Sequence, residues 1–202
     1  MRVLVACEYS GRVRDAFRAL GHDAWSCDLL PSEADPRYHL QGDVREYLGW
    51  GWSLMVAHPE CTRLCNSGVR WLHERNLWDE LDAACHFFRE LLNAPIPRIA
   101  IENPVPHKYA VERIGRSYDF TTQPYEHGDP YTKRTCFWLK NLPPLVPSNP
   151  VKGREPAVHR ASPGPDRWKE LSRTYPGLAR AIAAQWGATD EAAAVKENTE
   201  KL

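Results

Sequence analysis

Two side chains in this sequence suit covalent acid–base chemistry, and each follows a short apolar run. Cys61 stands in a polar loop after the run 54–57, two positions beyond Pro59, and Glu102 directly follows the run 99–101. A cysteine thiolate is a strong nucleophile, and a carboxyl group close to it can assist by moving a proton. Burial beside the apolar run predicts a raised pKa for Glu102, which favours its protonated form. We therefore take Cys61 as the candidate nucleophile and Glu102 as the candidate acid.

Both residues also have purely structural interpretations. Cysteine is often a buried and inert thiol, which is the interpretation that we favour for Cys27, Cys85 and Cys136. Cys61 differs because it follows a proline in a polar loop, where a reactive thiol is more often found. For Glu102, the alternatives are a helix cap or an ion pair.

The elements that must position these residues are visible as alternating strand and helix patterns. Strands are predicted at 2–6, 24–27, 54–57, 99–101 and 135–139, with a further short strand that ends at Gly42-Asp43. Helices are predicted after Ser10-Gly11, with Val13, Phe17 and Leu20 inward and Gly21 as the stop, and at 77–92 and 176–186. Because parallel strands need crossover connections, this alternation predicts an α/β fold with a mainly parallel, twisted sheet and helices on both faces.

Ligands of such sheets gather at the carboxyl ends of the strands, and several polar residues of this chain fall there. Ser10-Gly11 follow the first strand, Asp28 the second and Asp43 the short third one. The N–H groups at the start of the first helix can hold a carboxylate, and an acid after the second strand suits ribose hydroxyl groups. Capping of surface turns is the alternative for both aspartates.

Taken in chain order, these segments resemble the cytosine-5 DNA methyltransferase family. The matching segments are Cys7-Glu8-Tyr9-Ser10-Gly11, Asp28, Gly42-Asp43, Pro59-Glu60-Cys61, Glu102-Asn103-Pro104, Gly128-Asp129-Pro130-Tyr131-Thr132-Lys133-Arg134-Thr135 and Arg173-Thr174-Tyr175-Pro176-Gly177. Each segment alone is a weak signal, but their common order covers nearly the whole chain. Small proteins of this appearance are typical of phages and prophages.

The resemblance implies a Rossmann-like methyltransferase fold, S-adenosylmethionine as cofactor and methyl transfer to carbon 5 of cytosine. It gives Cys61 the attack on carbon 6 of the ring, while Glu102 holds or protonates ring nitrogen 3. The resulting enamine can attack a methyl group through its carbon 5. A base must then remove the carbon 5 proton so that the cysteine can leave, and the sequence does not identify that base.

Two sets of binding residues are also implied by the resemblance. The cofactor set consists of Cys7, Glu8, Ser10, Gly11, Asp28, Asp43 and Pro59. In this set, Asp28 is expected at the ribose, Asp43 at the adenine amino group and the turn at Ser10-Gly11 at the methionine carboxylate. The substrate set consists of Asn103, Lys133, Arg134, Arg160 and Arg167.

The chain departs from the family next to its nucleophile. The family has a proline directly before the cysteine, where this chain has Glu60. A carboxylate beside the thiol opposes thiolate formation, unless a nearby cation offsets it. The candidate cations are Arg63, Arg70 and Lys133. The basic motif departs as well, with Tyr131, Lys133 and Thr135 in place of the family's glutamine and two arginines.

The predicted organisation is one methyltransferase domain, 1–187, followed by a flexible or frayed tail, 188–202. A proline-rich loop at 143–166 stands where the family has a long target-recognition region, and reading a sequence in the major groove needs more surface than that. Three alternatives follow for the partner: DNA bound weakly with little sequence preference, a protein that supplies specificity, or a free cytosine nucleotide. A catalytically inactive binding module with the same fold is a further alternative.

Composition agrees with one cytoplasmic domain. The 202 residues are 43% hydrophobic, carry no net charge and include 6 cysteines, which we expect to be reduced. No apolar run is long enough for a membrane span. Basic residues outnumber acidic ones only locally, between Lys152 and Arg180. His58-Pro59-Glu60 fits half of a zinc-deaminase signature, with Cys61 and Cys65 nearby, but its second half is missing, so no metal is expected.

Overall fold

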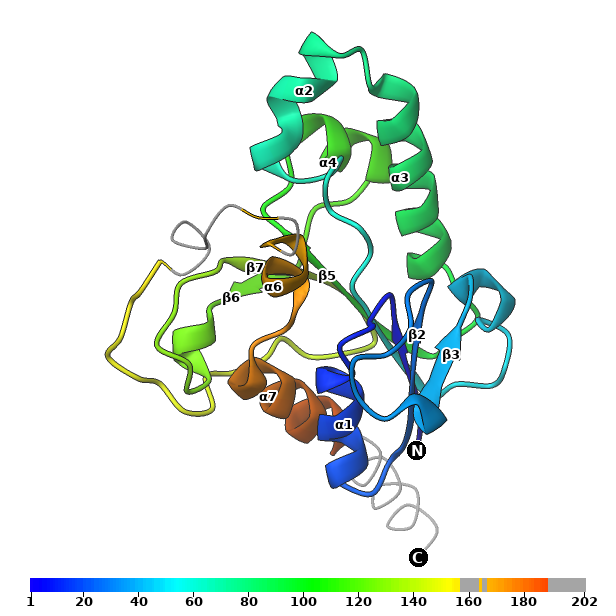
Figure 1. Ribbon diagram of the computed structural model, residues 1–202, viewed down its shortest axis with the longest axis vertical. Coiled ribbons are helices and arrows are strands. Elements are labelled where there is room, and N and C mark those ends of the chain that lie inside the picture. Colours follow the sequence, from blue (N-terminus) through cyan, green and yellow to red (C-terminus); the bar gives the residue numbers. More distant parts are fainter. Residues whose placement is uncertain (157–163, 165–166, 189–202) are drawn as a thin grey trace, which may run out of the picture.

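The computed structural model describes residues 1–156, 164 and 167–188, and these residues build one seven-stranded sheet (Figure 1). Its strands are β1 (Arg2–Ala6), β2 (Asp23–Asp28), β3 (His39–Gln41), β4 (Leu54–Ala57), β5 (Arg98–Pro104), β6 (Phe120–Thr122) and β7 (Thr135–Lys140). Across the sheet they follow the order β3-β2-β1-β4-β5-β7-β6.

Strand direction identifies the fold class. The strands from β3 across to β5 are parallel, whereas β7 is antiparallel to both of its neighbours, β5 and β6. The order 3-2-1-4-5 is that of doubly wound dinucleotide-binding sheets, and here an antiparallel strand is inserted before the last one. This arrangement confirms the predicted α/β, Rossmann-like fold with a mainly parallel sheet.

Helices cover both faces of the sheet, as predicted (Figure 1). The helices are α1 (Arg12–Ala19), α2 (Val69–Glu74), α3 (Trp78–Leu92), α4 (Lys108–Ile114), α6 (Arg167–Ser172) and α7 (Pro176–Gly187). Short 3₁₀ turns lie at Pro36–Tyr38, Val44–Glu46, Asn66–Gly68 and Pro124–Glu126. On one face, α1 and α7 pack on β1 and β4 through Val13, Phe17 and Ile182, and on the other α3 and α4 pack through Phe88 and Ile114.

Several elements differ from those that the sequence predicts. Leu20 is 53% exposed, so the prediction that it faces inward is wrong. The cause is local, since α1 ends at Ala19 and Leu20 caps it before Gly21 turns the chain at φ 83°. The short elements α2, α4, α6 and β6 have no counterpart among the predictions. Most of the predicted tail, 189–202, lies outside the described residues, as do 157–163 of the proline-rich loop.

No helix within the described ranges is both long and apolar enough to cross a membrane. The described part of the proline-rich segment, 143–156, contains neither a helix nor a strand. One of its residues, Leu145, is buried against the α7 side of the sheet, so this segment is anchored at its beginning.

Trp138 on β7 offers a test of the core. Its side chain is fully buried and packs edge-on against Phe88, with ring centroids 4.9 Å apart, while its indole N–H donates to the carbonyl of Arg116 at 3.1 Å. We expect Trp138→Ala to lower the free energy of unfolding by about 3–5 kcal/mol in urea denaturation, because it leaves a large cavity. Trp50 is 51% exposed, so the control Trp50→Ala should cost no more than about 1 kcal/mol. Equal losses in the two variants would contradict this core.

Candidate functional site

Four polar residues form one row at the carboxyl edge of the sheet, because β2, β1, β4 and β5 are parallel and in register there. The paired residues just before the row are Cys27, Ala6, Ala57 and Ile101. The row itself consists of Asp28, Cys7, His58 and Glu102. Neighbouring strands lie about 4.8 Å apart, so adjacent members of the row can touch. The row contains three predicted site residues, together with His58, which the sequence suggested only as half of a metal motif.

Cys7 and Asp28 form the cofactor-side half of this row. Cys7 has φ 56°, a left-handed conformation that costs a residue with a side chain roughly 1–2 kcal/mol. Burial, followed by the charge of Asp28, raises the pKa of Cys7, so its thiol stays protonated. Burial also raises the pKa of Asp28. The hydrogen bond that its carboxylate accepts from the N–H of Leu30, at 2.9 Å, lowers the pKa but does not outweigh burial. Asp43 lies close to this end of the row, because the N–H of the preceding Gly42 donates to the carbonyl of Asp28 at 2.9 Å.

The N–H groups at the start of α1 already hold a carboxylate, and it belongs to the chain itself. Glu8 is 5% exposed, and its side chain accepts from the N–H of Val13 at 2.7 Å, the N–H of Arg14 at 3.2 Å and the hydroxyl of Ser10 at 3.2 Å. The expectation that these N–H groups receive an external carboxylate is therefore wrong for Val13 and Arg14. Glu8 instead fixes the turn in which Gly11 adopts φ 72°.

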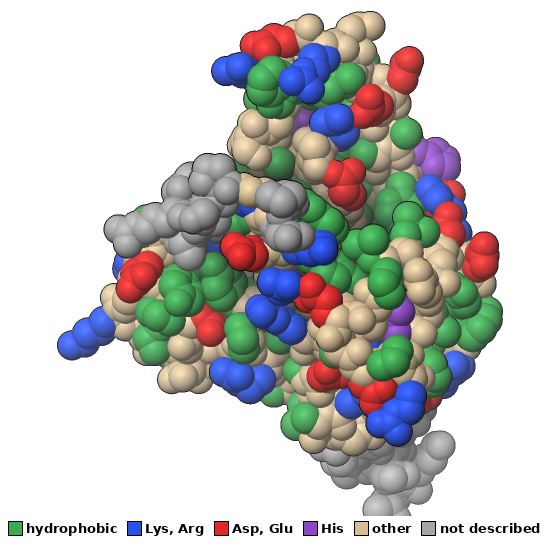
Figure 2. Space-filling view, viewed as in Figure 1, with side chains coloured by type: hydrophobic (Ala, Val, Ile, Leu, Met, Phe, Trp, Pro, Cys, Tyr) green, Lys and Arg blue, Asp and Glu red, His purple; other side chains and the backbone are tan. Residues whose placement is uncertain are grey.

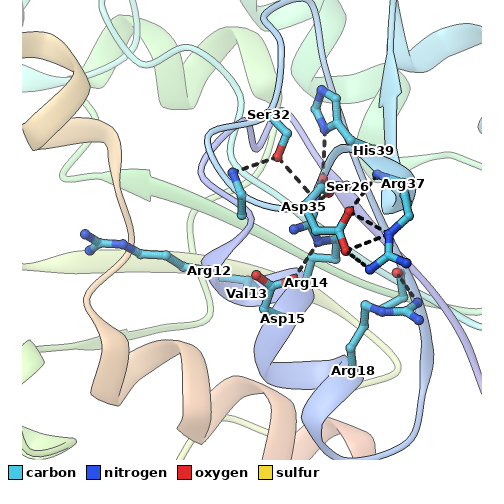
Figure 3. A network of polar contacts seen from close by, with 12 residues as sticks. Arg12, Val13, Arg14, Asp15, Arg18, Ser26, Ser32, Asp35, Arg37 and His39 are labelled. Atoms are coloured by element: carbon cyan, nitrogen blue, oxygen red, sulfur yellow. Dashed lines mark hydrogen bonds and ion pairs between the residues drawn. The ribbon is translucent and has the colours of Figure 1, made fainter.

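A buried arginine on α1 holds the loop that follows Asp28 (Figure 3). Arg14 is fully buried, and its guanidinium donates to Asp15 at 2.8 Å, to the hydroxyl of Ser26 at 3.1 Å and to the carbonyl of Asp35 at 3.0 Å. Asp15 is half exposed, so the ion pair reaches the surface at one end. Because Ser26 lies on β2 and Asp35 lies beyond it, Arg14 ties both sides of the Asp28 turn to α1.

Asp43 caps a 3₁₀ turn and is ionised. Its two carboxylate oxygens accept from the N–H of Arg45 at 3.0 Å and from the guanidinium of the same residue at 2.8 Å. The backbone hydrogen bond is the largest cause of its lowered pKa. These contacts correspond to the capping alternative, and they leave lone pairs on both oxygens. Whether Asp43 also meets an adenine ring stays a prediction.

Glu102 is paired with His58 and is ionised, which corrects the sequence expectation. The His58 Nδ1 atom lies 3.2 Å from a carboxylate oxygen of Glu102, and the two side chains are only 8% and 14% exposed. Burial raises the pKa of Glu102, but the hydrogen bond from His58 and the charge of Lys133 outweigh it, so the net shift is downward. The expected raised pKa is therefore wrong, because it assumed burial without partners.

Cys61 shares a helical turn with a second thiol. The N–H groups of Leu64 and Cys65 both donate to the carbonyl of Cys61, at 2.9 and 3.0 Å, so the two cysteines lie on one face of the turn. The hydrogen bond to Cys65 is the largest cause of the raised pKa of Cys61, with burial and Glu102 adding to it. Cys65 has a lowered pKa, because Cys61, Ser67 and backbone N–H groups all donate to its sulfur.

Of the three cations that could offset the charge of Glu60, Lys133 is the one that lowers the pKa of the nucleophile Cys61. Arg63 and Arg70 each form an ion pair with a glutamate elsewhere, at 2.8 and 3.1 Å. Glu60 itself is exposed. The carboxylate that raises the pKa of Cys61 is that of Glu102 rather than that of its sequence neighbour.

Two small cavities lie on either side of His58. One of about 10 Å³ is lined by His58, Glu102, Lys133, Thr135, Phe137, Thr174, Tyr175, Leu178 and Ile182. The other, of about 40 Å³, is lined by Cys7, Glu8, Tyr9, Ser10, His58, Ser172, Arg173 and Thr174. Sequence reasoning missed His58 as a member of this site, although its place directly after an apolar strand was a usable signal. Both cavities have room for water, and ligand pockets are typically some 300 Å³ or more.

The segment from α6 to Tyr175 covers the two cavities. Tyr9 donates to the carbonyl of Lys169 at 3.0 Å, and Lys133 donates to the carbonyl of Leu171 at 2.8 Å. Arg173 forms a bidentate ion pair with Glu33, at 2.7 and 2.8 Å. These contacts place α6 over the edge of the sheet, as Figure 1 shows.

The predicted substrate residues do not all gather here. Lys133 faces Glu102 in the smaller cavity, while Arg134 is exposed and Arg167 begins α6. Asn103 is 1% exposed and donates its amide to the carbonyl of the next residue at 2.6 Å, so it lines neither cavity. Arg160 lies outside the described residues.

The local basic strip between Lys152 and Arg180 is partly neutralised. Arg173 is paired with Glu33, and Arg154 lies over the ring of Tyr125, 3.4 Å from its centroid. Figure 2 shows Lys and Arg side chains interspersed with acidic ones on the face that carries α6. Among the residues that the structure describes, no group of three or more His, Cys, Asp or Glu side chains could hold a metal ion.

Comparisons with known proteins give distant structural likenesses alone. No protein-family model matches the chain, and no curated protein does. It is similar to a candidate DNA modification methyltransferase from an E. coli prophage, at 14% identity over 80% of this chain and 54% of that one, with a TM-score of 0.45. It is also similar to the methyltransferase EhMeth of Entamoeba histolytica (13% identity, 81% and 60% covered, TM-score 0.44) and to the S. pombe Dnmt2 methyltransferase (14%, 79% and 54%, 0.46). The chain thus spans less than two thirds of the length of each of these proteins.

The two thiols of the shared turn can be tested directly. Replacing Cys65 by alanine is expected to lower the pKa of Cys61, because the bond to Cys65 is the largest cause of its upward shift. Alkylation of Cys61 by iodoacetamide, followed by peptide mass spectrometry, should then reach half its maximal rate at a lower pH. Cys85→Ala, a buried thiol on α3, is the matched control and should leave the profile unchanged. An identical profile in Cys65→Ala and the wild type would show that the thiols are not coupled.

Proposed function

We propose that this chain transfers a methyl group from S-adenosylmethionine to carbon 5 of cytosine, through a covalent adduct of Cys61. One observation carries the proposal: Cys61, Glu102 and Lys133 come from three separate segments, and they lie close enough for the charges of Glu102 and Lys133 to shift the pKa of Cys61. Glu102 raises the pKa of Cys61, and Lys133 lowers the pKa of both. A nucleophile, a carboxylate and a cation at one strand edge are the groups that activation of a cytosine ring requires.

The chemistry starts from the weak reactivity of cytosine, whose carbon 5 is too poor a nucleophile to attack a methyl sulfonium unaided. Addition of the Cys61 sulfur to carbon 6 places electron density on carbon 5, which becomes an enamine carbon. The developing negative charge spreads toward ring nitrogen 3 and the ring carbonyl, where Lys133 is suited to stabilise it. Cys61 must first give up its proton to water, and the charge of Lys133 favours this step because it lowers the pKa of Cys61.

Glu102 suits the holding role at the ring better than the acid role. Because its pKa is lowered, it meets the ring as a carboxylate, which accepts hydrogen bonds and has no proton of its own to give. One oxygen accepts from His58, which leaves the other for the ring amino group, or for nitrogen 3 once that atom is protonated. Glu102 thereby orients the ring and stabilises its protonated form.

The residues at the cofactor end fit S-adenosylmethionine by their chemistry. The carboxyl group of Asp28 at the end of β2 suits ribose hydroxyls, and Asp43 keeps free lone pairs for an amino group. The bound cofactor would supply an electrophilic methyl group. Since the cavity between Cys7 and Thr174 measures about 40 Å³, entry of a nucleoside requires α6 and the following residues to move outward.

DNA is the substrate that we favour, with a free cytosine nucleotide as the alternative. Zero net charge and the Glu33 partner of Arg173 leave a weak electrostatic attraction for phosphates, so DNA binding should be weak and strongly dependent on salt. A protein partner that supplies specificity is compatible with this. The raised pKa of Cys61 favours a second candidate function, a binding module that no longer transfers methyl groups.

The covalent step can be trapped with DNA synthesised with 5-fluorocytosine in place of cytosine. Fluorine cannot leave as a proton does, so elimination stops after methyl transfer and the protein stays attached. We expect Cys61→Ala to abolish the attached species in denaturing gels and Cys65→Ala to preserve it. Glu102→Gln should slow attachment by about a hundredfold or more. Methylation of carbon 5 by Cys61→Ala, detected by nucleoside mass spectrometry, would rule out the covalent route.

The cofactor residues can be tested by calorimetry with S-adenosylmethionine. Asp43→Ala is expected to weaken binding by about 1–3 kcal/mol, the value of a hydrogen bond to a charged group. Asp35 is the matched control, because it caps another 3₁₀ turn and pairs with Arg37 in the same way as Asp43 with Arg45. Asp35→Ala should leave the affinity unchanged. Equal affinities of Asp43→Ala and the wild type would remove Asp43 from the cofactor site.

A further inference from the structure

His58 occupies the centre of the site, between the cofactor end and the cytosine end. It follows β4 directly, and its backbone N–H donates to the carbonyl of Ala6 at 2.9 Å, which extends the pairing of β4 with β1. Its side chain is 8% exposed and lines both cavities, with Glu102 and Lys133 on one side and Cys7 to Ser10 on the other. A group in this position lies where a methyl donor and a cytosine ring would meet.

The two ring nitrogens of His58 have different surroundings. Nδ1 lies 3.2 Å from the ionised carboxylate of Glu102, which can only accept, so Nδ1 carries the hydrogen. In the neutral ring Nε2 then presents a lone pair. Nε2 is buried and has no hydrogen-bond partner among the described residues. Because a buried polar atom without a partner destabilises the folded protein, such an atom indicates a group that binds a ligand.

We propose that His58 is the base that removes the carbon 5 proton of the methylated cytosine, with Glu102 as the residue that orients it; this assignment rests on the proposed function. The carbon 5–hydrogen bond breaks, and the proton passes to Nε2. The electron pair of the broken carbon 5–hydrogen bond forms the carbon 5–carbon 6 double bond. The bond from carbon 6 to the Cys61 sulfur breaks at the same time, which releases the thiolate. His58 then returns the proton to water.

Other groups around the two cavities are less suited to this step. The carboxylate of Glu8 is occupied by the N–H groups of α1. The raised pKa of Cys7 keeps its thiol protonated, and the raised pKa of Tyr175 keeps its hydroxyl protonated. Lys133 is a cation that donates to the carbonyl of Leu171. His58 combines a free acceptor atom with a carboxylate that stabilises the imidazolium formed by proton uptake.

The test separates attachment from release. His58→Asn keeps an amide donor near the Nδ1 position, so Glu102 retains its partner, but the acceptor at Nε2 is lost. On DNA with 5-fluorocytosine, where no proton is removed, His58→Asn should attach at a rate close to that of the wild type. On DNA with cytosine tritiated at carbon 5, it should release tritium into water at least about a hundredfold more slowly, and the attached species should accumulate.

Each outcome has one meaning. Tritium release by His58→Asn at the wild-type rate would overturn the assignment of the base. Loss of attachment on 5-fluorocytosine DNA, in a variant with an unchanged thermal melting curve, would also overturn it and make His58 a positioning residue for Glu102. If His58→Asn does not fold, His58→Gln provides the tritium measurement, because an amide is too weak a base to replace the Nε2 lone pair. Failure of the wild type itself to attach would overturn the proposed function, and the base assignment with it.

Discussion

The parallel register of β1 with its neighbours is the constraint on which the site depends. The parallel pairing among β2, β1, β4 and β5 ends at Cys27, Ala6, Ala57 and Ile101. The next residue of each chain segment therefore falls into one row, which consists of Asp28, Cys7, His58 and Glu102. A shift of one residue in any strand would turn its side chain to the other face of the sheet. The contact between His58 and Glu102 is therefore a consequence of the pairing of Ala57 with Ile101.

Polar groups buried beside this row are costly, and the chain offsets the cost with hydrogen bonds to and from α1. Glu8 receives the first N–H groups of α1, which stabilise its negative charge as they would an external anion. The side chain of Arg14, in the first turn of α1, ties β2 and the loop beyond Asp28 to the same helix. The start of α1 thus serves the structure of the turn, and the proposed cofactor binding at this end falls to Asp28, Asp43 and the groups that line the cavity.

Local patterns predicted the strands well and the electrostatics poorly. The runs 2–6 and 54–57 are β1 and β4 as found, since each contains four consecutive apolar residues, which leave little choice for a buried parallel strand. The ionisation of Glu102 was beyond prediction, because His58 lies 44 residues away in the chain and Lys133 lies on a third segment. Similarly, Glu8 was predicted beside a ligand, but whether a carboxylate faces a ligand or its own helix depends on a turn geometry that spacing does not reveal.

Closure of the site and its electrostatics are connected through Lys133. The ammonium group of Lys133 lowers the pKa of Glu102 and Cys61, and it also donates to the carbonyl of Leu171 in α6. Outward movement of α6 would break this hydrogen bond and free the cation to turn toward the strand edge. In the proposed reaction, entry of a ring would then coincide with a stronger pull on the Cys61 proton, so that the thiolate would form when a target is present. A thiol that stays protonated in the closed protein is also protected from reaction with other electrophiles.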